Sequence, residues 1–332
     1  MNTGNSYLKY VAMVMGIIFL IAATFLFVTL WQNSQQNVDD TGYVYDTLTY
    51  EGREYVRKER VETFLLLGLD RYADSQVSDA HGTGVQADFL LLMVLDNDTK
   101  QCTALQVNRD AMTKVNKLSI GGTAVVQSYT AQIALAYNAV NDDNEKIRCR
   151  NTVDSLEYLL PGVDVDHYFA LTMDAVAASC DAVGGVEITV LDDFTGIDDT
   201  LVKGETVMLN GQQALRYVRT RYGMEDSTNS TRMERQRQYL DALYQRIFEK
   251  MNSDQGFALE LAQALDGHVA YDSSDRRMQM LLEKIHEYEY LGIRQLEGQT
   301  VQGEEFMEFY PEEASVLKTV IDLYYTPKTN GD

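Results

Sequence analysis

The sequence has few of the residues from which covalent or histidine-based metal sites are built. Its three cysteines are in no CxxC or other metal-ligand spacing, so neither a disulfide framework nor a zinc site is indicated, and core thiols are expected at Cys102, Cys149 and Cys180. Histidine is scarce too, with single residues at His81, His167, His268 and His286. His167 lies in a strand-like run, DHYFALT, and is expected to be structural. The sequence therefore predicts no histidine triad and no histidine metal cluster.

The chain also lacks positive charge. Lys and Arg together number 28 against 50 Asp and Glu, which gives a formal net charge of −22 over 332 residues. Binding to a nucleic-acid duplex needs a broad basic face, so no nucleic-acid partner is expected. Hydrophobic residues make up 45% of the chain, which suits a globular region of one or two domains.

One long apolar run stands near the N-terminus, at residues 11–31. At 1.5 Å per residue this run can cross the roughly 30 Å of hydrocarbon in a bilayer, and it predicts a single transmembrane helix. A cleaved signal peptide is the alternative, but the run is long for one and TLWQNSQQ after it lacks a small-x-small cleavage site. Lys9 precedes the run and Asp39 is the first charge after it, so residues 1–10 are expected in the cytoplasm and the rest of the chain outside.

The remainder predicts a layered α/β or α+β domain with a mixed central sheet. A polar stalk at 32–42 precedes a domain that is expected to begin near residue 43 with a hairpin turning at Glu51 and Gly52. Strands are predicted at 63–70, 88–96, 102–107, 167–172 and 186–190, and helices at about 127–140, 150–160 and 173–182. The pattern is mainly helical from Thr231, and 251–332 is expected to be a mainly helical extension packed on the same domain.

Residues 216–238 hold six arginines and no lysine, an unusual concentration for so acidic a chain. Arg219 and Arg221 are two apart in a predicted extended segment and should point the same way. Arg232, Arg235 and Gln236 share one face of the following helix. Arginine forks match phosphate oxygens, so the stretch predicts either a phosphate site or ion pairs with neighbouring surface acids.

Carboxylates at strand ends offer a second set of candidates. Asp70 closes one predicted strand, Asp88 opens the next, and Arg109 and Asp110 directly follow a third. Two carboxylates without histidine suit Mg²⁺, which shares its shell with substrate phosphates. Each aspartate taken alone is more often a cap or turn residue.

Taken in order, these motifs resemble those of the LytR-CpsA-Psr family of membrane-anchored cell-wall glycopolymer ligases. The matching segments run from about residue 48 to 250 and are LLLGLD, ADFLLLMVLD, NRDAM, LLPGVDVDHYFALTMDA, DAVGGVEITV, LNGQQALRYVRTR and RMERQRQYL. The resemblance implies an α/β/α fold at 43–250 that holds a polyprenyl pyrophosphate, with the lipid tail in an apolar tunnel between the sheet and helices. It also implies a cell-membrane protein whose domain lies outside, where a teichoic acid or capsular polysaccharide is transferred from the carrier lipid to a peptidoglycan sugar hydroxyl.

The resemblance assigns roles residue by residue. It places Asp70 and Asp88 on the Mg²⁺, and it places a polar set around the pyrophosphate, comprising Arg109, Arg219, Arg221, Arg232, Arg235 and Gln236. Four of the site residues are expected to be catalytic, namely Arg109, Asp110, Arg219 and Arg221. Asp110 is either the base for the attacking hydroxyl or an orienting partner of Arg109.

Three positions depart from the family pattern. Asn108 replaces a proline, Gln86 stands where an arginine is common, and Asn229 occupies the place of an aspartate that Asp226 could replace. Two of these changes remove a charge from the expected pyrophosphate site. A non-catalytic lipid-pyrophosphate binding or wall-assembly protein, or a pyrophosphatase on the same lipid, therefore stands beside the ligase as an alternative.

Overall fold

The computed structural model describes residues 47–71, 85–221, 223–224, 228–254, 256–274 and 285–328. The expected cytoplasmic N-terminus, membrane anchor and stalk, at 1–42, lie outside these ranges. Within them, no helix is both long and apolar enough to cross a membrane.

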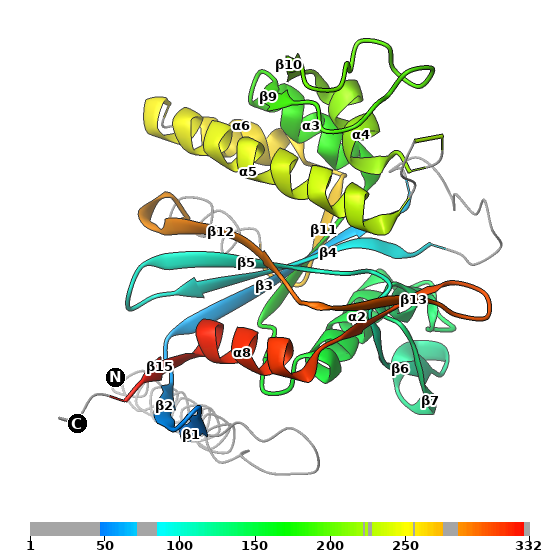
Figure 1. Ribbon diagram of the computed structural model, residues 1–332, viewed down its shortest axis with the longest axis vertical. Coiled ribbons are helices and arrows are strands. Elements are labelled where there is room, and N and C mark those ends of the chain that lie inside the picture. Colours follow the sequence, from blue (N-terminus) through cyan, green and yellow to red (C-terminus); the bar gives the residue numbers. More distant parts are fainter. Residues whose placement is uncertain are drawn as a thin grey trace, which may run out of the picture. The chain divides into compact units, whose positions relative to one another are not determined.

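A mixed six-stranded sheet forms the centre of the fold, in the order β11-β8-β3-β4-β5-β12 (Figure 1). Its strands are β3 Val61–Leu69, β4 Ala87–Asp96, β5 Gln101–Val107, β8 His167–Leu171, β11 Val269–Tyr271 and β12 Glu289–Gln295. β3 pairs parallel with β8 and antiparallel with β4, which pairs antiparallel with β5. The predicted mixed central sheet is confirmed.

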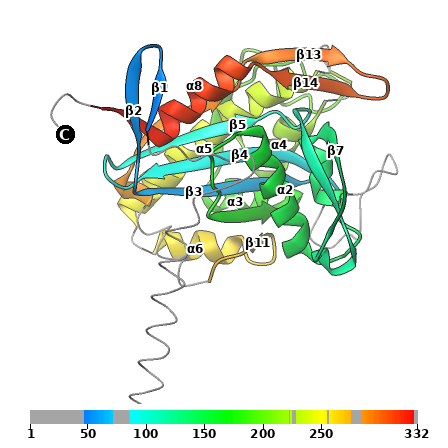
Figure 2. The ribbon, with the colours of Figure 1, turned by 90° about the horizontal axis from the view of Figure 1, so that it is seen from below.

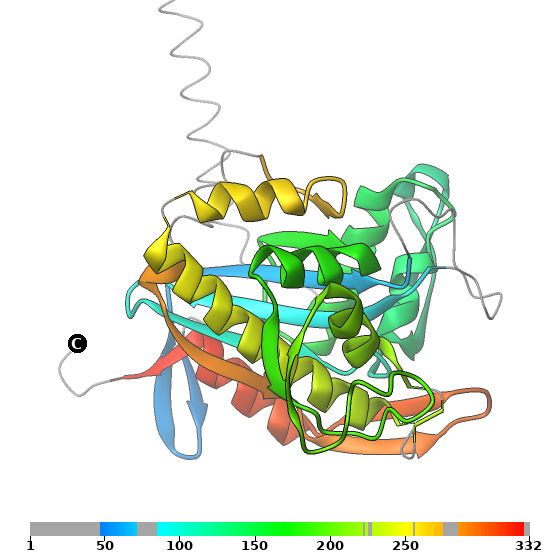
Figure 3. The ribbon, with the colours of Figure 1, turned by 90° about the horizontal axis from the view of Figure 1, so that it is seen from above.

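Helices cover both faces of this sheet, as predicted (Figure 1). One face packs on α2 Glu145–Leu159 and α8 Glu313–Tyr324 through a core that includes Leu65, Leu92 and Leu156. Over the other face lie α3 Met173–Ala182, α4 Gly211–Arg219, α5 Asn229–Ser253 and α6 Phe257–Ala264 (Figure 3). The near-continuous apolar runs in β3 and β4 follow from burial on both faces.

Among the described residues, four smaller sheets surround the centre. They pair β1 Thr47–Tyr50 and β2 Arg53–Arg57 with β15 Tyr325–Pro327, β6 Met112–Leu118 with β7 Val125–Gln132, β9 Val186–Thr189 with β10 Thr206–Leu209, and β13 Gly298–Gln302 with β14 Met307–Pro311. The predicted turn at Glu51 and Gly52 is confirmed, with φ values of 49° and 77°. The β1–β2 and β13–β14 hairpins lie at opposite ends of α8 (Figure 2).

The helix predicted at about 127–140 is wrong. The chain forms β7 there, followed by a 3₁₀ helix, η2 Ile133–Asn138. Val125, Val126 and Tyr129 favour extended backbone, and β7 can pair with β6 because Gly121 and Gly122 reverse the chain at positive φ. A short 3₁₀ turn, η1 Ile120–Gly122, closes this hairpin.

The described part of the predicted helical extension at 251–332 is instead mixed. It contains α6, α8 and the short η3 Ile285–Glu287, but also five strands, β11 to β15. β12 lies parallel to β5 and β11 antiparallel to β8, so both edges of the central sheet come from this segment. Unpaired strand edges expose backbone groups, and the added strands satisfy them.

Two capped helices carry the arginine-rich stretch. α4 begins with a capping box in which Asn210 accepts from the Gln213 amide and Gln213 bonds back to the Asn210 N–H. Thr228 caps the N-terminus of α5, and its hydroxyl accepts from the Thr231 amide. Between the helices, Thr220 has φ −60° and ψ 132°, which confirms the extended exit that the sequence predicts after Arg219.

Candidate functional site

Asp70 and Asp88 lie at the same end of the central sheet, where β3 ends and β4 begins. Asp70 follows the last residue of β3, and its amide donates to the carbonyl of Gln86 at 3.0 Å. The register between β3 and β4 shifts between Gly68 and Leu69, which leaves Asp88 as the extra residue of a bulge. Bulges re-aim side chains at strand ends, and this one leaves the Asp88 carboxylate half-buried beside the arginines described next.

Arg109 follows β5, and its side chain contacts residues at this end of the sheet. One of its terminal nitrogens donates to Oδ1 of Asp88 and the other donates to Oε1 of Gln86. Its Nε lies 3.4 Å from Oδ1 of Asp110. Arg109 therefore bridges β4 and the turn after β5.

Arg232 reaches the same carboxylate from the first turn of α5. Its Nη1 lies 3.4 Å from Oδ2 of Asp88, and its Nη2 donates to Oδ1 of Asn229 at 2.7 Å. Arg232 is 6% exposed, and burial lowers the pKa of its guanidinium while Asp88 opposes that shift. Asp88 thus lies between two largely buried arginines.

Arg219 and Arg221 complete the group from the end of α4. Nη2 of Arg219 lies 3.3 Å from Oδ1 of Asp70, with the two side chains 42% and 34% exposed. The charge of Arg221 acts on both Asp110 and Arg232, so it too faces this site. We call the four arginines 109, 219, 221 and 232 the arginine cluster.

Asp110 is the most buried acid beside the cluster, with 6% exposed. It accepts from the side-chain amide of Gln132 at 3.0 Å. Burial raises the pKa of its carboxyl, while Arg109, Arg232 and Arg221 lower it and Asp88 raises it further. A carboxylate with a raised pKa is the better proton acceptor, so the environment suits Asp110 to general-base chemistry.

The cluster has unused capacity to bind an anion. In the part of the chain that the structure describes, the buried Nε of Arg232 has no hydrogen-bond partner, and the buried Nε of Arg109 has only the 3.4 Å ion-pair contact with Asp110. Buried donors without acceptors are costly, and an anion with several oxygens would satisfy them.

Asp70 and Asp88 fit Mg²⁺ only if water and substrate phosphates supply its other ligands. Among the described residues, no group of three or more His, Cys, Asp or Glu side chains is arranged to hold a metal. Both oxygens of Asp88 face arginines, and Asp70 faces Arg219. Two oxygen ligands suit a Mg²⁺ that takes its other ligands from water and substrate phosphates, as this ion usually does.

The three positions that depart from the family pattern all bond to the site. Gln86 accepts from Arg109, and Asn229 accepts from Arg232. The Asn229 amide also donates to Oδ1 of Asn108 at 2.8 Å, and the same oxygen accepts the Asp110 N–H at 2.9 Å. A proline at 108 could not accept through its side chain, and an ionised aspartate at 229 could not donate. Asn108 and Asn229 therefore form a matched pair that sequence patterns alone did not reveal. Asp226 lies outside the described residues.

Arg235 and Gln236 contact other partners than the cluster. Arg235 has only 1% of its side chain exposed, with Nε 3.0 Å from Asp192 and its terminal nitrogens donating to the carbonyls of Tyr217 and Thr220. Gln236 donates to the carbonyl of Val218 at 3.2 Å and accepts from Gln106 at 3.1 Å. These contacts join α5 to α4 and to β5.

A polar bridge between the sheet and α5 was not expected from the sequence. Gln106, on β5, is 1% exposed and accepts from Arg237 at 2.8 Å while donating to Gln236. Burial lowers the pKa of the Arg237 guanidinium. The signal in the sequence was a glutamine inside an otherwise apolar strand, CTALQV.

The expected structural residues lie within the core. All three cysteines are free and buried, which confirms the predicted core thiols. His167 lies 3.3 Å from Asp272 through Nδ1 and 5.6 Å from the ring of Phe64, as a structural histidine should.

Comparison with known proteins supplies the family context. The model of the LytR_cpsA_psr family matches residues 29–323. Biofilm regulatory protein A of Streptococcus mutans is 28% identical over 206 residues, which cover 60% of this chain and 47% of the relative, so the match spans about half of that protein. The polyisoprenyl-teichoic acid–peptidoglycan teichoic acid transferase TagU of Enterococcus faecalis is 25% identical over 273 residues, 80% of each chain.

Solved structures show the same fold at lower identity. TagT bound to LI-WTA matches with a TM-score of 0.59 and 19% identity over 86% of this chain and 95% of that one. The protein gbs0355 of Streptococcus agalactiae matches with a TM-score of 0.61 and 20% identity over 80% of this chain and 86% of that one.

Proposed function

Because the chain belongs to the LytR-CpsA-Psr family, we propose that it transfers a glycopolymer from a polyprenyl-pyrophosphate carrier to a sugar hydroxyl of peptidoglycan. The arginine cluster is the observation that carries this proposal. The cluster gathers fixed positive charge and, at Nε of Arg232, a buried donor without a hydrogen-bond partner among the described residues, in a chain whose net charge is −22. The transferase name of the Enterococcus faecalis relative supports the same reaction class.

The arrangement suits a pyrophosphate that lies across the end of the central sheet. Arg109 and Arg232 would hold it from the buried side, with Arg219 and Arg221 on the more exposed side. In phosphoryl transfer most of the catalytic effect comes from stabilising the charge that builds on the leaving group, here the polyprenyl phosphate. Gln86 and Asn229 would hold the guanidiniums of Arg109 and Arg232 in place for this role.

We assign Asp70 and Asp88 as the carboxylates that would hold Mg²⁺ together with the phosphates. When bound, the ion would neutralise part of the phosphate charge. Arg109, Arg219 and Arg232, which contact these carboxylates in the structure, would bind the phosphate oxygens. Asp110, with its raised pKa, would accept the proton of the attacking hydroxyl.

The proposal places the domain outside the cell membrane, tethered by a helix at residues 11–31, where both the carrier lipid and peptidoglycan are accessible. Two other functions use the same site. The uncharged Gln86 and Asn229 favour a lipid-pyrophosphate receptor without turnover, and the pyrophosphate-binding geometry is equally compatible with a hydrolase.

A turnover assay separates these three functions. The full-length chain in detergent is incubated with a polyprenyl-pyrophosphate-linked glycopolymer and Mg²⁺, with and without uncrosslinked peptidoglycan strands. For a transferase we expect release of polyprenyl phosphate and labelled polymer on the strands, both only when acceptor is present. Binding without turnover in either arm indicates a receptor, and release of polyprenyl phosphate without acceptor indicates a hydrolase.

Arg219→Lys tests the pyrophosphate grip directly. Lysine keeps the charge but loses the two-pronged geometry, and a charge-assisted hydrogen bond contributes about 1.5–3 kcal/mol, so polyprenyl-pyrophosphate affinity should fall by roughly 10- to 100-fold. Thermal stability should change little, since the Arg219–Asp70 pair is exposed. Titration calorimetry with the lipid measures the first effect and thermal melting the second.

Arg216→Lys is the matched control, because Arg216 lies on the same helix, is 52% exposed and pairs with Asp198 instead. Its lipid affinity should equal that of the wild type. Equal affinity for the Arg219→Lys variant as well would show that Arg219 only balances a surface acid.

A further inference from the structure

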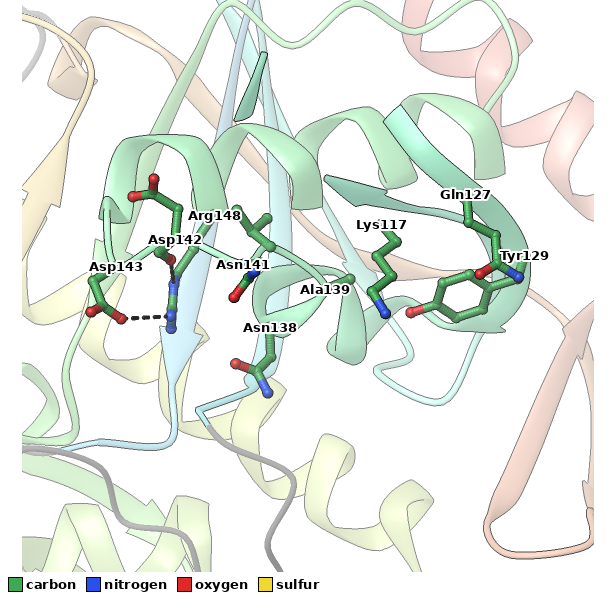
Figure 4. A pocket seen from close by; sticks show the side chains of 10 residues that line it. Lys117, Gln127, Tyr129, Asn138, Ala139, Asn141, Asp142, Asp143 and Arg148 are labelled. Carbon is green, nitrogen blue, oxygen red and sulfur yellow. Dashed lines mark hydrogen bonds and ion pairs between the residues drawn. The ribbon is translucent and has the colours of Figure 1, made fainter. Parts of the chain in front are cut away.

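A second hollow lies beside the β6–β7 hairpin and the start of α2. This groove has a volume of about 930 Å³, and its polar lining is made chiefly by Lys117, Gln127, Tyr129, Asn138, Asn141 and Arg148. In Figure 4 the side chains of Lys117 and Tyr129 extend toward one another at one end, with Asn138 and Asn141 between them and Arg148. None of these six residues was expected from the sequence to belong to a site.

The groove is connected to the arginine cluster by a short rigid segment. In the first turn of η2, the Ala134 amide donates to the backbone carbonyl of Arg109 at 3.1 Å. The helix ends at Asn138, which lines the groove. At about 2 Å of rise per residue, the two points are about 8 Å apart along the helix. On the other side, Arg71 follows Asp70 and pairs with Glu145 of α2, one turn before Arg148.

The groove's charges cancel. Lys117 and Arg148 contribute two positive charges, and Asp142 and Asp143 contribute two negative ones. Arg148 is already held by Asp143 at 3.1 Å and by the carbonyl of Asp142 at 2.7 Å. A polyanion gains nothing from such a surface and is repelled by the chain's overall charge of −22, so a neutral ligand fits better.

The remaining groups suit an uncharged sugar chain that carries amides. The side chains of Gln127 and Asn141 present both amide donors and carbonyl acceptors, which can pair with hydroxyl and acetamido groups. Tyr129 is 37% exposed and offers an aromatic face with a polar tip, a combination common where a ligand has both apolar and polar edges.

We propose that this groove is the acceptor subsite and binds a neutral, N-acetylated glycan strand. The inference rests on the proposed function, since it supplies the strand whose hydroxyl attacks the pyrophosphate held by the arginine cluster. η2 would keep the two subsites at a constant separation. The acceptor would thus be selected by its acetamido groups and lack of charge, while the donor is selected by its phosphates.

Binding of β-1,4-linked N-acetylglucosamine oligomers to the full-length chain in detergent tests the proposal. Loss of an aromatic contact at a ligand site should weaken binding about tenfold, and we expect this for Tyr129→Ala, with a similar loss for Asn141→Ala. Tyr158→Ala is the matched control, because Tyr158 is 41% exposed and lies under Lys114, outside the groove. It should leave affinity unchanged.

A second arm uses poly(glycerol phosphate) in place of the glycan. Glycan binding that is lost in Tyr129→Ala and kept in Tyr158→Ala, without measurable poly(glycerol phosphate) binding at the groove, supports the acceptor assignment. Polyanion binding that depends on Tyr129 would instead make the groove a donor-polymer site and overturn the proposal, as would equal glycan affinity in all variants. The Arg219→Lys titration reads the pyrophosphate site separately, so failure of the proposed function leaves this result interpretable.

Discussion

Asp88→Asn is expected to reduce both the stability and the metal dependence of this protein. The Asp88 carboxylate lies between Arg109 and Arg232, whose side chains are only 14% and 7% exposed. Removing one member of a buried ion pair costs about 3–5 kcal/mol, since it leaves uncompensated charge. We expect the melting temperature to fall by roughly 5–15 °C.

The same change should alter ligand binding in a way that a purely structural role would not. Without Asp88, the arginines lose an internal competitor, so inorganic pyrophosphate should bind the variant more tightly than the wild type when no Mg²⁺ is present. Addition of Mg²⁺ should no longer improve binding, and transfer should be abolished. Differential scanning fluorimetry with pyrophosphate, with and without Mg²⁺, measures the two binding effects, and the turnover assay measures transfer.

Asp70→Asn is the companion variant, because the Asp70–Arg219 pair is exposed and its loss should cost under about 1 kcal/mol. This variant separates an effect on metal binding from an effect on stability, since turnover should be lost while stability changes little. If either variant keeps Mg²⁺-dependent transfer, the assignment of these two carboxylates to the metal is wrong.

Arg235→Lys is expected to destabilise the fold by about 3 kcal/mol while leaving pyrophosphate affinity intact. The buried guanidinium lies 5.3 Å from the ring centroid of Phe194 and bonds to two carbonyls in addition to Asp192. A lysine ammonium cannot reach these acceptors in the same fork, and an unsatisfied buried acceptor costs about 1–3 kcal/mol. Thermal melting and lipid titration on the folded variant measure the two quantities.

Arg246→Lys, on the same helix, is the control for Arg235→Lys. Its side chain is 34% exposed, so the exchange should change stability by less than about 1 kcal/mol. A stable Arg235→Lys variant with weakened lipid binding would instead show that Arg235 binds the pyrophosphate, as its position in the family motif implies.

Local sequence was sufficient to predict several elements of the fold. The helix predicted at 173–182 is α3, and the strands predicted at 88–96 and 102–107 are β4 and β5 within one residue. These segments have strong local signals, such as the glycine pair after α3 and the NDTK turn between the strands. The failure at 127–140 shows the limit, because short apolar segments fit either a helix or a strand until a partner strand is present.

The candidate site also has parts that the sequence predicted and parts that only the structure showed. Strand-end position made Asp70, Asp88 and Arg109 candidates, and the arginine-rich stretch added Arg219 and Arg232, but only the family resemblance assigned them one site. The structure pairs Arg109 and Arg232 with Asp88, and Arg219 with Asp70. Helical spacing put Arg235 on the same face as Arg232, yet the two guanidiniums contact different partners. Spacing fixes the direction in which a side chain leaves its helix, but a long arginine reaches whichever acceptor lies near its tip.

The sequence by itself determined which charges and which apolar runs this protein has, and therefore its layered sheet and its arginine-rich segment. Tertiary structure decided which acid faces which arginine, why Asn108 and Asn229 belong together, and where a neutral groove lies relative to the cluster. The physical reason is that backbone propensities act over a few residues, whereas ion pairs and grooves are formed by residues distant in the chain. Arg219 and Asp70, separated by 149 positions, meet only after the sheet and α4 have packed.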